Sequence, residues 1–190
     1  MKVLGISASP RRQGNTEILL DRALEGAKET GAEAEKIILN ERHYSPCQEC
    51  GGCDKTGICI VNDDMQEIFR KIDASDAIIV ASPIFFGSIA AQLKMMIDRY
   101  QCYWIRKYVL KQTREKRKGF FICVGGQNRQ DFFQNAEKLV RIFFTNIDVT
   151  YTGALFYPCI NGKGEVWEHS EAMTEVYERG KSVVRSMQTK

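Results

Sequence analysis

Apolar runs alternate along this chain with stretches that are apolar on one side only. Short, nearly continuous apolar runs are typical of buried strands and occur at 2–7, 35–39, 77–82, 118–125 and 149–156. Apolar residues recur every three or four positions, as on one face of a helix, at 16–30, 65–74, 89–100, 131–146 and 170–187. The pattern therefore predicts five strands alternating with five helices.

The alternation also predicts the fold class. Strands that read as nearly continuous apolar runs are buried on both faces, which favours a parallel sheet with helices on each side. We expect an α/β fold, a doubly wound five-stranded parallel sheet in three layers α/β/α, formed as a single domain over residues 1–190. Ligands of such sheets bind beyond the carboxyl ends of the strands, so the loops that follow the strands should hold the chemistry.

The loop after the first strand has the composition of a phosphate site. It carries the hydroxyls of Ser9 and Thr16, the amide of Asn15 and the guanidinium of Arg11 just where a helix begins. A helix N-terminus favours an anion, and these groups add hydrogen bonds and charge. Neither the G-x4-G-K-[ST] nor the G-x-G-x-x-G spacing is present. This absence argues against a nucleoside triphosphate site and against a Rossmann-type dinucleotide site. The alternative is that Ser, Asn and Thr only cap the helix.

Two further loops could hold a flat ring. After the strand at 77–82 the chain continues with Pro83, Ile84, Phe85, Phe86, Gly87 and Ser88, and after the strand at 118–125 with Gly125, Gly126 and Gln127. Large apolar groups beside a glycine suit an aromatic ligand, and paired glycines let backbone approach the polar edge of a ring. The alternative for the phenylalanines is ordinary core packing.

Four cysteines are concentrated in a loop at 44–62. Cys47, Cys50, Cys53 and Cys59 follow the spacing C-x2-C-x2-C-x5-C, so one continuous loop could reach four corners of a 4Fe-4S cluster. Structural zinc sites typically take paired cysteines from two separated segments. Zinc, free thiols and disulfides nevertheless stay open as alternatives on the spacing alone.

The composition of the chain limits the binding partners that we expect. The net charge of +3, from 27 Lys and Arg against 24 Asp and Glu, does not argue for nucleic acid. No apolar run is long enough to cross a bilayer, so the chain reads as cytoplasmic, without a membrane partner. Cys102 and Cys123 read as buried apolar residues. The only histidines, His43 and His169, belong to no recognisable triad, and no catalytic acid or base is expected.

These residues resemble those of the NADPH-dependent FMN reductase branch of the flavodoxin-like superfamily. With the cysteine loop after the second strand, the chain is similar to the iron-sulfur flavoproteins of anaerobic archaea and bacteria. The resemblance is carried by Gly5–Thr16, Cys47–Asp64 and Ser82–Arg99. The resemblance implies that the FMN phosphate is held by Ser9, Arg11, Asn15 and Thr16. It also implies that Pro83–Ser88 contact the ribityl chain and isoalloxazine and that Gly125–Gln127 border the ring. The four loop cysteines would ligate a 4Fe-4S cluster. The chain departs from relatives after Gly126, where they are richer in glycine.

The same resemblance implies a redox function. Electrons would pass between a one-electron, ferredoxin-like donor and an acceptor such as oxygen, peroxide or a quinone, in homodimers or homotetramers where the cluster of one subunit lies near the flavin of another. A second hypothesis is an NAD(P)H-dependent FMN or quinone reductase whose cysteine loop is structural or binds zinc. A third is a zinc-stabilised flavodoxin-like binding module. The basic segment 106–118 could attract an acidic ferredoxin or a neighbouring subunit, or could simply be solvated.

Overall fold

A parallel sheet forms the centre of the protein in the computed structural model, which describes residues 1–113, 115 and 117–188. Its parallel strands stand in the order β2-β1-β3-β5-β6, and a short β4 pairs antiparallel with β3. The strands are β1 (Lys2–Ser7), β2 (Glu33–Ile38), β3 (Ala77–Phe85), β4 (Ser88–Ile89), β5 (Arg117–Val124) and β6 (Val149–Tyr157). The predicted α/β class and the doubly wound sheet of five parallel strands are confirmed.

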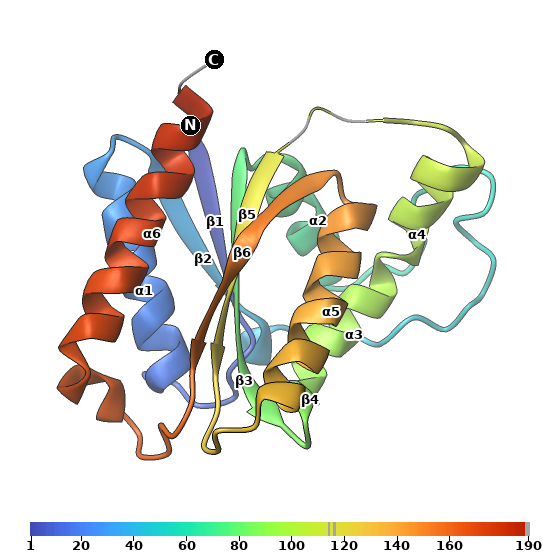
Figure 1. Ribbon diagram of the computed structural model, residues 1–190. Helices are drawn as coiled ribbons and strands as arrows, with labels where there is room; N and C mark the ends of the chain where they lie inside the picture. The colour runs from blue at the N-terminus through green and yellow to red at the C-terminus, as the bar shows by residue number, and fades with distance from the viewer. Residues whose placement is uncertain (114, 116, 189–190) are drawn as a thin grey trace.

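Helices cover both faces of the sheet. α1 and α6 lie on one face, and α2, α3 and α5 lie on the other, with α4 extending outward from the end of α3 (Figure 1). The helices are α1 (Asn15–Glu29), α2 (Met65–Asp73), α3 (Ala91–Arg99), α4 (Gln101–Trp104), α5 (Gln130–Asn146) and α6 (Ser170–Gln188), with shorter turns η1 (Leu39–Glu41), η2 (Ile105–Val109) and η3 (Glu165–Glu168). Within the described ranges, none of these helices combines the length and apolar content that a membrane span requires.

The core consists of two layers because successive strand residues face opposite sides of the sheet. Ile79 and Ala81 of β3 pack with α1 and α6, whereas Ile78 and Val80 pack with α2, α3 and α5. Burial on both faces explains why the strands read as continuous apolar runs rather than as an alternating pattern.

The segment after the central strand differs from the prediction. Residues 83–88 were expected to form a loop, but β3 continues to Phe85 and Ile84 pairs with Ile89 across a tight hairpin. Only Phe86 and Gly87 remain as the connection, and α3 begins two residues later than the apolar period indicates. Periodicity does not signal this hairpin because it is only two residue pairs long. Of the basic segment 106–118, residues 114 and 116 lie outside the described residues.

Strand register brings the predicted loops together. Ser7 at the end of β1 lies beside Ala81 of β3, and Pro83 of β3 lies beside Val124 at the end of β5. The loops after β1, β3 and β5 therefore leave the sheet at one edge, which is the lower edge in Figure 1.

Candidate functional sites

A cavity of about 160 Å³ lies at this edge of the sheet. Eight residues predicted for the site line it: Ser9, Arg11, Asn15, Thr16, Pro83, Ile84, Phe85 and Gly126. The other predicted residues lie outside its lining: Phe86, Gly87, Ser88, Gly125 and Gln127. The loops after β1 and β5 and the end of β3 itself thus converge on one cavity, as expected for the carboxyl ends of strands in a doubly wound sheet.

The first turn of α1 faces this cavity without a side-chain cap. Gly14 is the N-cap residue, and no side chain bonds the first-turn amides from that position. Ser9 does not cap the helix, since its hydroxyl instead accepts the Arg11 amide at 3.2 Å. Thr16 is buried, and its hydroxyl has no hydrogen-bond partner among the described residues. An uncapped helix start with an unused hydroxyl is a ready anion site.

The loop after β6 completes the cavity, and sequence reasoning did not assign it. Asn15 Nδ2 donates to the Gly162 carbonyl at 2.7 Å, and Asn15 Oδ1 accepts the Val166 amide at 3.2 Å. Asn161 and Lys163 of this loop line the cavity. Asn15 is therefore committed largely to holding one loop against another. The signal for these residues was available, since this loop too follows the carboxyl end of a strand.

The hairpin beside the cavity exposes aromatic rings. Phe85 is 44% exposed and Phe86 is completely exposed, so neither is a core residue. Phe86 and Gly87 both have positive φ, at 48° and 74°, which the two-residue connection requires. Asn135 Nδ2 of α5 donates to the Gly87 carbonyl at 2.9 Å and fixes the hairpin tip. The cavity thus has a polar wall on the α1 side and an apolar, aromatic wall on the β3 side.

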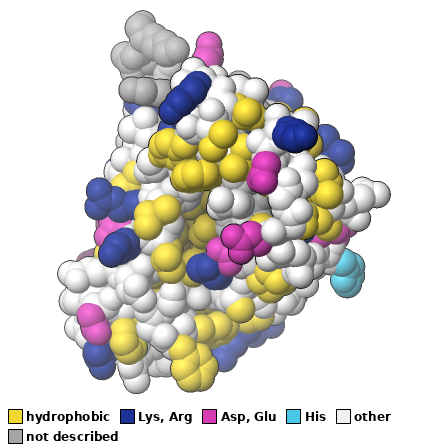
Figure 2. All heavy atoms as spheres, turned by 90° about the vertical axis from the view of Figure 1, so that its right-hand side faces the viewer, with side chains coloured by type: hydrophobic (Ala, Val, Ile, Leu, Met, Phe, Trp, Pro, Cys, Tyr) yellow, Lys and Arg dark blue, Asp and Glu magenta, His cyan; other side chains and the backbone are white. Residues whose placement is uncertain are grey.

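The four predicted cysteines line one second cavity of about 310 Å³. This cavity lies against the ends of α3 and α4, where Arg99 and Cys102 complete its wall. Among the described residues no three His, Cys, Asp or Glu side chains are placed to hold one metal ion. The face that carries the cysteine segment gathers hydrophobic side chains (Figure 2). Those most exposed in the segment and in adjacent α4 and η2 are Ile58, Ile60, Trp104, Tyr108 and Val109.

Side-chain hydrogen bonds to and from the neighbouring helices hold the cysteine segment, which contains neither strand nor helix from 44 to 62. Gln66 of α2 donates to the Cys59 carbonyl at 3.0 Å, Tyr44 donates its hydroxyl to the Gln92 carbonyl at 2.7 Å, and Arg106 Nε donates to the Gly57 carbonyl at 2.6 Å. The segment is therefore attached through a few side-chain contacts and not through a sheet ladder.

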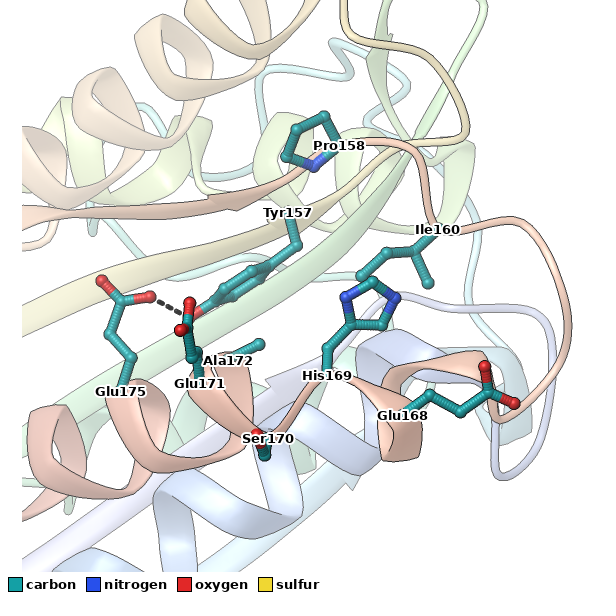
Figure 3. A pocket seen from close by; sticks show the side chains of 9 residues that line it. All are labelled: Tyr157, Pro158, Ile160, Glu168, His169, Ser170, Glu171, Ala172 and Glu175. Atoms are coloured by element: carbon teal, nitrogen blue, oxygen red, sulfur yellow. Dashed lines mark hydrogen bonds between the residues drawn. The ribbon is translucent and has the colours of Figure 1, made fainter.

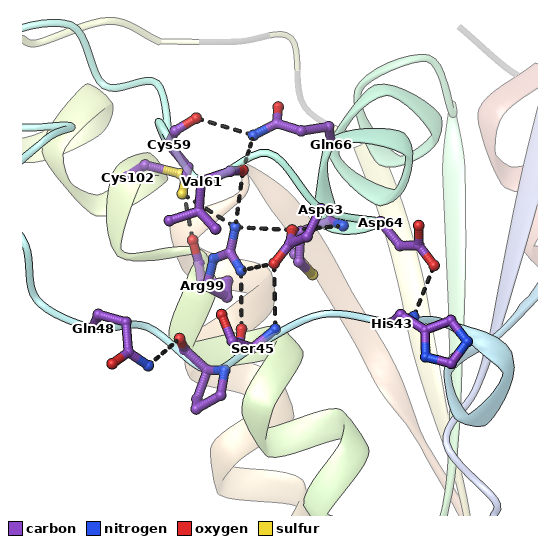
Figure 4. Close-up of polar contacts among 12 residues, drawn as sticks. His43, Ser45, Gln48, Cys59, Val61, Asp63, Asp64, Gln66, Arg99 and Cys102 are labelled. Atoms are coloured by element: carbon purple, nitrogen blue, oxygen red, sulfur yellow. Dashed lines mark hydrogen bonds and ion pairs between the residues drawn. The ribbon is translucent and has the colours of Figure 1, made fainter.

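Arg99 and Asp63 form the buried ion pair of this region (Figure 4). Arg99 Nη1 lies 2.6 Å from Asp63 Oδ2. Burial by itself raises the pKa of Asp63, but hydrogen bonds from the Arg99 guanidinium and the Ser45 amide hold that pKa below its ordinary value. The Asp63 carboxyl also accepts the Met65 amide at 3.1 Å, so it both begins α2 and pairs with α3.

Cys102 and Cys123 are buried, as predicted. Burial raises the pKa of the Cys102 thiol to about 12 and also raises the pKa of Cys123. Thiols with raised pKa values are poor nucleophiles at neutral pH, so both behave as apolar residues. Cys159, by contrast, is exposed.

A third cavity, of about 610 Å³, opens beside the end of β6 and the start of α6 (Figure 3). Three carboxylates line it, from Glu168, Glu171 and Glu175, and Glu175 accepts the Tyr157 hydroxyl at 2.8 Å. Concentrated negative charge disfavours a phosphate there. The smaller cavity over the uncapped helix is a better anion site than this larger, acidic one.

Strand order and binding edge define a flavodoxin-like α/β protein. A family model described as NADPH-dependent FMN reductase matches residues 1–157. An iron-sulfur flavoprotein of Methanosarcina thermophila is 40% identical over 126 residues, covering 66% of this chain and 64% of that protein. Iron-sulfur flavoprotein MJ0731 of Methanocaldococcus jannaschii is 31% identical over 183 residues, covering 91% of this chain and 90% of that protein. The chain belongs to the NADPH-dependent FMN reductase family, a family of oxidoreductases, and within it to the iron-sulfur flavoproteins.

Solved structures confirm the fold. An NAD(P)H:quinone oxidoreductase from Methanothermobacter marburgensis superposes with a TM-score of 0.76 at 18% identity, covering 96% of each chain.

Several curated relatives match over only part of their length: the first three matches cover 64%, 51% and 47% of those proteins.

Proposed function

We propose that the protein is an FMN- and 4Fe-4S-containing redox flavoprotein that passes electrons between a one-electron donor and an acceptor such as oxygen, peroxide or a quinone. The observation that carries this proposal is that one chain builds two separate cavities of different chemistry. One offers an anion site beside an aromatic wall, and the other is lined by four thiols. Family membership supports the flavin, and the names of the iron-sulfur flavoprotein relatives support the cluster.

The residues at the sheet edge fit FMN. The uncapped turn of α1, the unused Thr16 hydroxyl and the Arg11 guanidinium would hold its phosphate. Ile84 and Phe85 would border the ring, and Gly126 would let the backbone of the loop after β5 approach it. Bound FMN supplies the ability to take up two electrons together and release them one at a time. The protein then has to bind and orient the flavin, and no acid or base is needed for the electron transfer itself.

The cysteine cavity fits a cluster better than a single ion. Each thiolate of a 4Fe-4S cluster binds its own corner iron, whereas a single zinc ion needs four ligands at about 2.3 Å from one point. All four candidate ligands here come from one continuous loop, whereas structural zinc sites typically take paired cysteines from two separated segments.

The arrangement of the two cavities supports an oligomer. No residue lines both, and in Figure 1 the cysteine segment lies beside α3 and α4 while the flavin loops lie at the lower edge of the sheet. We therefore include in the proposal a homodimer or homotetramer in which the cluster of one subunit faces the flavin of another. A ferredoxin-like protein or NAD(P)H would be the donor.

The second candidate is an NAD(P)H-dependent FMN or quinone reductase whose cysteine segment is structural or binds zinc. It is favoured by the description of the family and by the printed name of the M. marburgensis neighbour. A zinc-stabilised binding module is supported less, since the family is one of oxidoreductases.

The test is to purify the protein without oxygen and to measure flavin, iron, acid-labile sulfide and zinc per chain. The proposal expects one FMN with four irons and four sulfides, and an absorbance shoulder beside the flavin bands that decays in air. Flavin without iron, bleached rapidly by NADPH, would establish the reductase instead. One zinc per chain without iron would contradict a redox role for the cysteine segment. With flavin bound it would favour the reductase, and without flavin the zinc-stabilised module.

A further inference from the structure

Arg99 joins the two ends of the cysteine segment. Its side chain is only 1% exposed, stands at the last position of α3, and lines the cavity with the four cysteines. Its guanidinium donates to the Ser45 carbonyl at 2.9 Å, before the first cysteine, and to the Asp63 carboxylate at 2.6 and 3.1 Å, after the last one (Figure 4). One side chain therefore closes the loop that carries all four thiols.

The same guanidinium reaches a cysteine directly. Arg99 Nη2 lies 3.3 Å from Cys59 Sγ, and Nε is buried without a partner among the described residues. A guanidinium stays protonated at any physiological pH, so it is a fixed positive donor. Such a donor beside a sulfur stabilises the thiolate, which is the form that binds metal.

A purely structural ion pair accounts for only part of this geometry. The Asp63 carboxylate engages one N–H on each terminal nitrogen of Arg99, which leaves the contact with Cys59 unexplained. Arg117 provides the comparison within the same molecule. It is also buried, and it donates to the carbonyls of Ile72 and Ile147, but it lines neither the cysteine cavity nor the flavin cavity.

We propose that Arg99 is a positioning residue for the metal centre: it holds Cys59 toward the common cavity and offsets the negative charge of the four thiolates. The inference rests on the proposed function and deepens it. Hydrogen bonds to sulfur are among the factors that set the potential of a cluster. Removing this positive donor should disfavour the more negative, reduced form and shift the reduction potential to a more negative value.

The experiment compares wild type with Arg99→Gln, Arg99→Lys and the matched control Arg117→Gln. Each full-length protein is reconstituted anaerobically with ferrous iron and sulfide, and iron affinity and reduction potential are measured. Loss of a partner that orients a metal ligand typically costs about 10- to 100-fold in affinity. We expect that loss and a more negative potential in Arg99→Gln, a smaller change in Arg99→Lys, which keeps the charge, and wild-type iron affinity in Arg117→Gln.

Hydrogen exchange of residues 45–63 in the metal-free proteins gives a readout that does not need the cluster. The segment should exchange faster in Arg99→Gln than in Arg117→Gln. If wild type binds no iron, the proposed function fails, and this exchange comparison still decides whether Arg99 holds the segment. If Arg99→Gln does not fold, Arg99→Lys decides by the same measurements. Wild-type iron affinity, potential and exchange in the Arg99 variants would overturn the inference.

Discussion

The edge of the sheet where we propose that FMN binds, formed by the loops after β1, β5 and β6 and the end of β3, is called the flavin edge here. The flavin edge and the cysteine segment are built by different means. At the flavin edge, the loops leave strands whose ends are in register, so the backbone itself places them. Close approach is part of that design, because a Cβ added to Gly126 would lie 2.0 Å from Asn161 Oδ1. The cysteine segment has no strand or helix of its own and depends on contacts from side chains such as Arg99, Arg106 and Gln66.

This difference indicates which kind of unfolding, global or local, would disrupt each site. A site placed by strand ends is tied to the stability of the whole sheet. A segment attached by a few side chains can open locally while the sheet stays folded, because local opening costs less free energy than global unfolding. The two sites should therefore fail independently.

Replacing a cysteine should give the largest effect and the most direct test of that independence. Cys53→Ser removes one thiolate from the cavity and is expected to abolish incorporation of the intact four-iron cluster, while FMN affinity stays at its wild-type value. Iron and flavin content per chain report the two sites separately. Cys159→Ser, at an exposed thiol outside this cavity, is the control and should change neither. Loss of flavin together with iron would show that the sites are coupled.

The reciprocal change removes a charge from the flavin edge. Arg11→Ala should weaken FMN binding by about tenfold or more, since a hydrogen bond to a charged group contributes about 1.5–3 kcal/mol, and iron content should not change. Titration of the apoprotein with FMN, followed by flavin fluorescence, measures the effect. Arg12→Ala is the matched control, because Arg12 pairs with Glu17 and Glu41 and does not line the cavity. Equal losses in both variants would argue for general electrostatic attraction instead of a phosphate contact.

A pair of glycine substitutions should separate local from global stability. Gly57 has φ of 66°, and an added Cβ would lie 2.2 Å from Arg106 Cγ, whereas Gly31 has φ of 84° with nothing within 4 Å. Both alanine variants should carry a left-handed strain of roughly 1–2 kcal/mol. Gly57→Ala should additionally displace Arg106 and speed hydrogen exchange within 44–62.

Thermal unfolding tests whether this damage stays local. The midpoint for Gly57→Ala should fall no further than that for Gly31→Ala, which lies in the turn between α1 and β2. A much lower midpoint for Gly57→Ala would mean that the cysteine segment unfolds together with the sheet.

The sequence predicted the strands and helices in which apolar residues recur at a regular spacing. Buried strands such as 77–82 and amphipathic helices such as 131–146 follow from burial on two faces or on one. The four cysteines of the predicted loop line one cavity, and the cluster itself stays a prediction. Contacts between distant residues have no such signature. Arg99 and Asp63 are 36 positions apart, and Asn15 meets Val166 across 151 positions, so neither pairing could be read from local spacing.

Glu17, in the first turn of α1, provides the prediction with the smallest expected change in stability. Its carboxylate is buried in the first turn of α1, where it accepts the Gln13 amide at 2.7 Å and the Lys36 ammonium at 2.8 Å. Burial alone raises the pKa of Glu17, but these bonds outweigh it and hold the pKa below the ordinary value of 4.5. A depressed pKa contributes stability that is present above the unfolded value and is lost as pH falls through the folded value.

Glu17→Gln should therefore reduce the free energy of unfolding near neutral pH by about 1 kcal/mol, and the difference from wild type should shrink as pH falls below that ordinary value. Urea unfolding at several pH values measures this. Asp131→Asn is the control, because Arg129 also lowers the pKa of Asp131 but both groups are fully exposed, and screened pairs add little. A pH-independent difference for Glu17→Gln would mean that its packing, and not its charge, holds the loop between β1 and α1 in place.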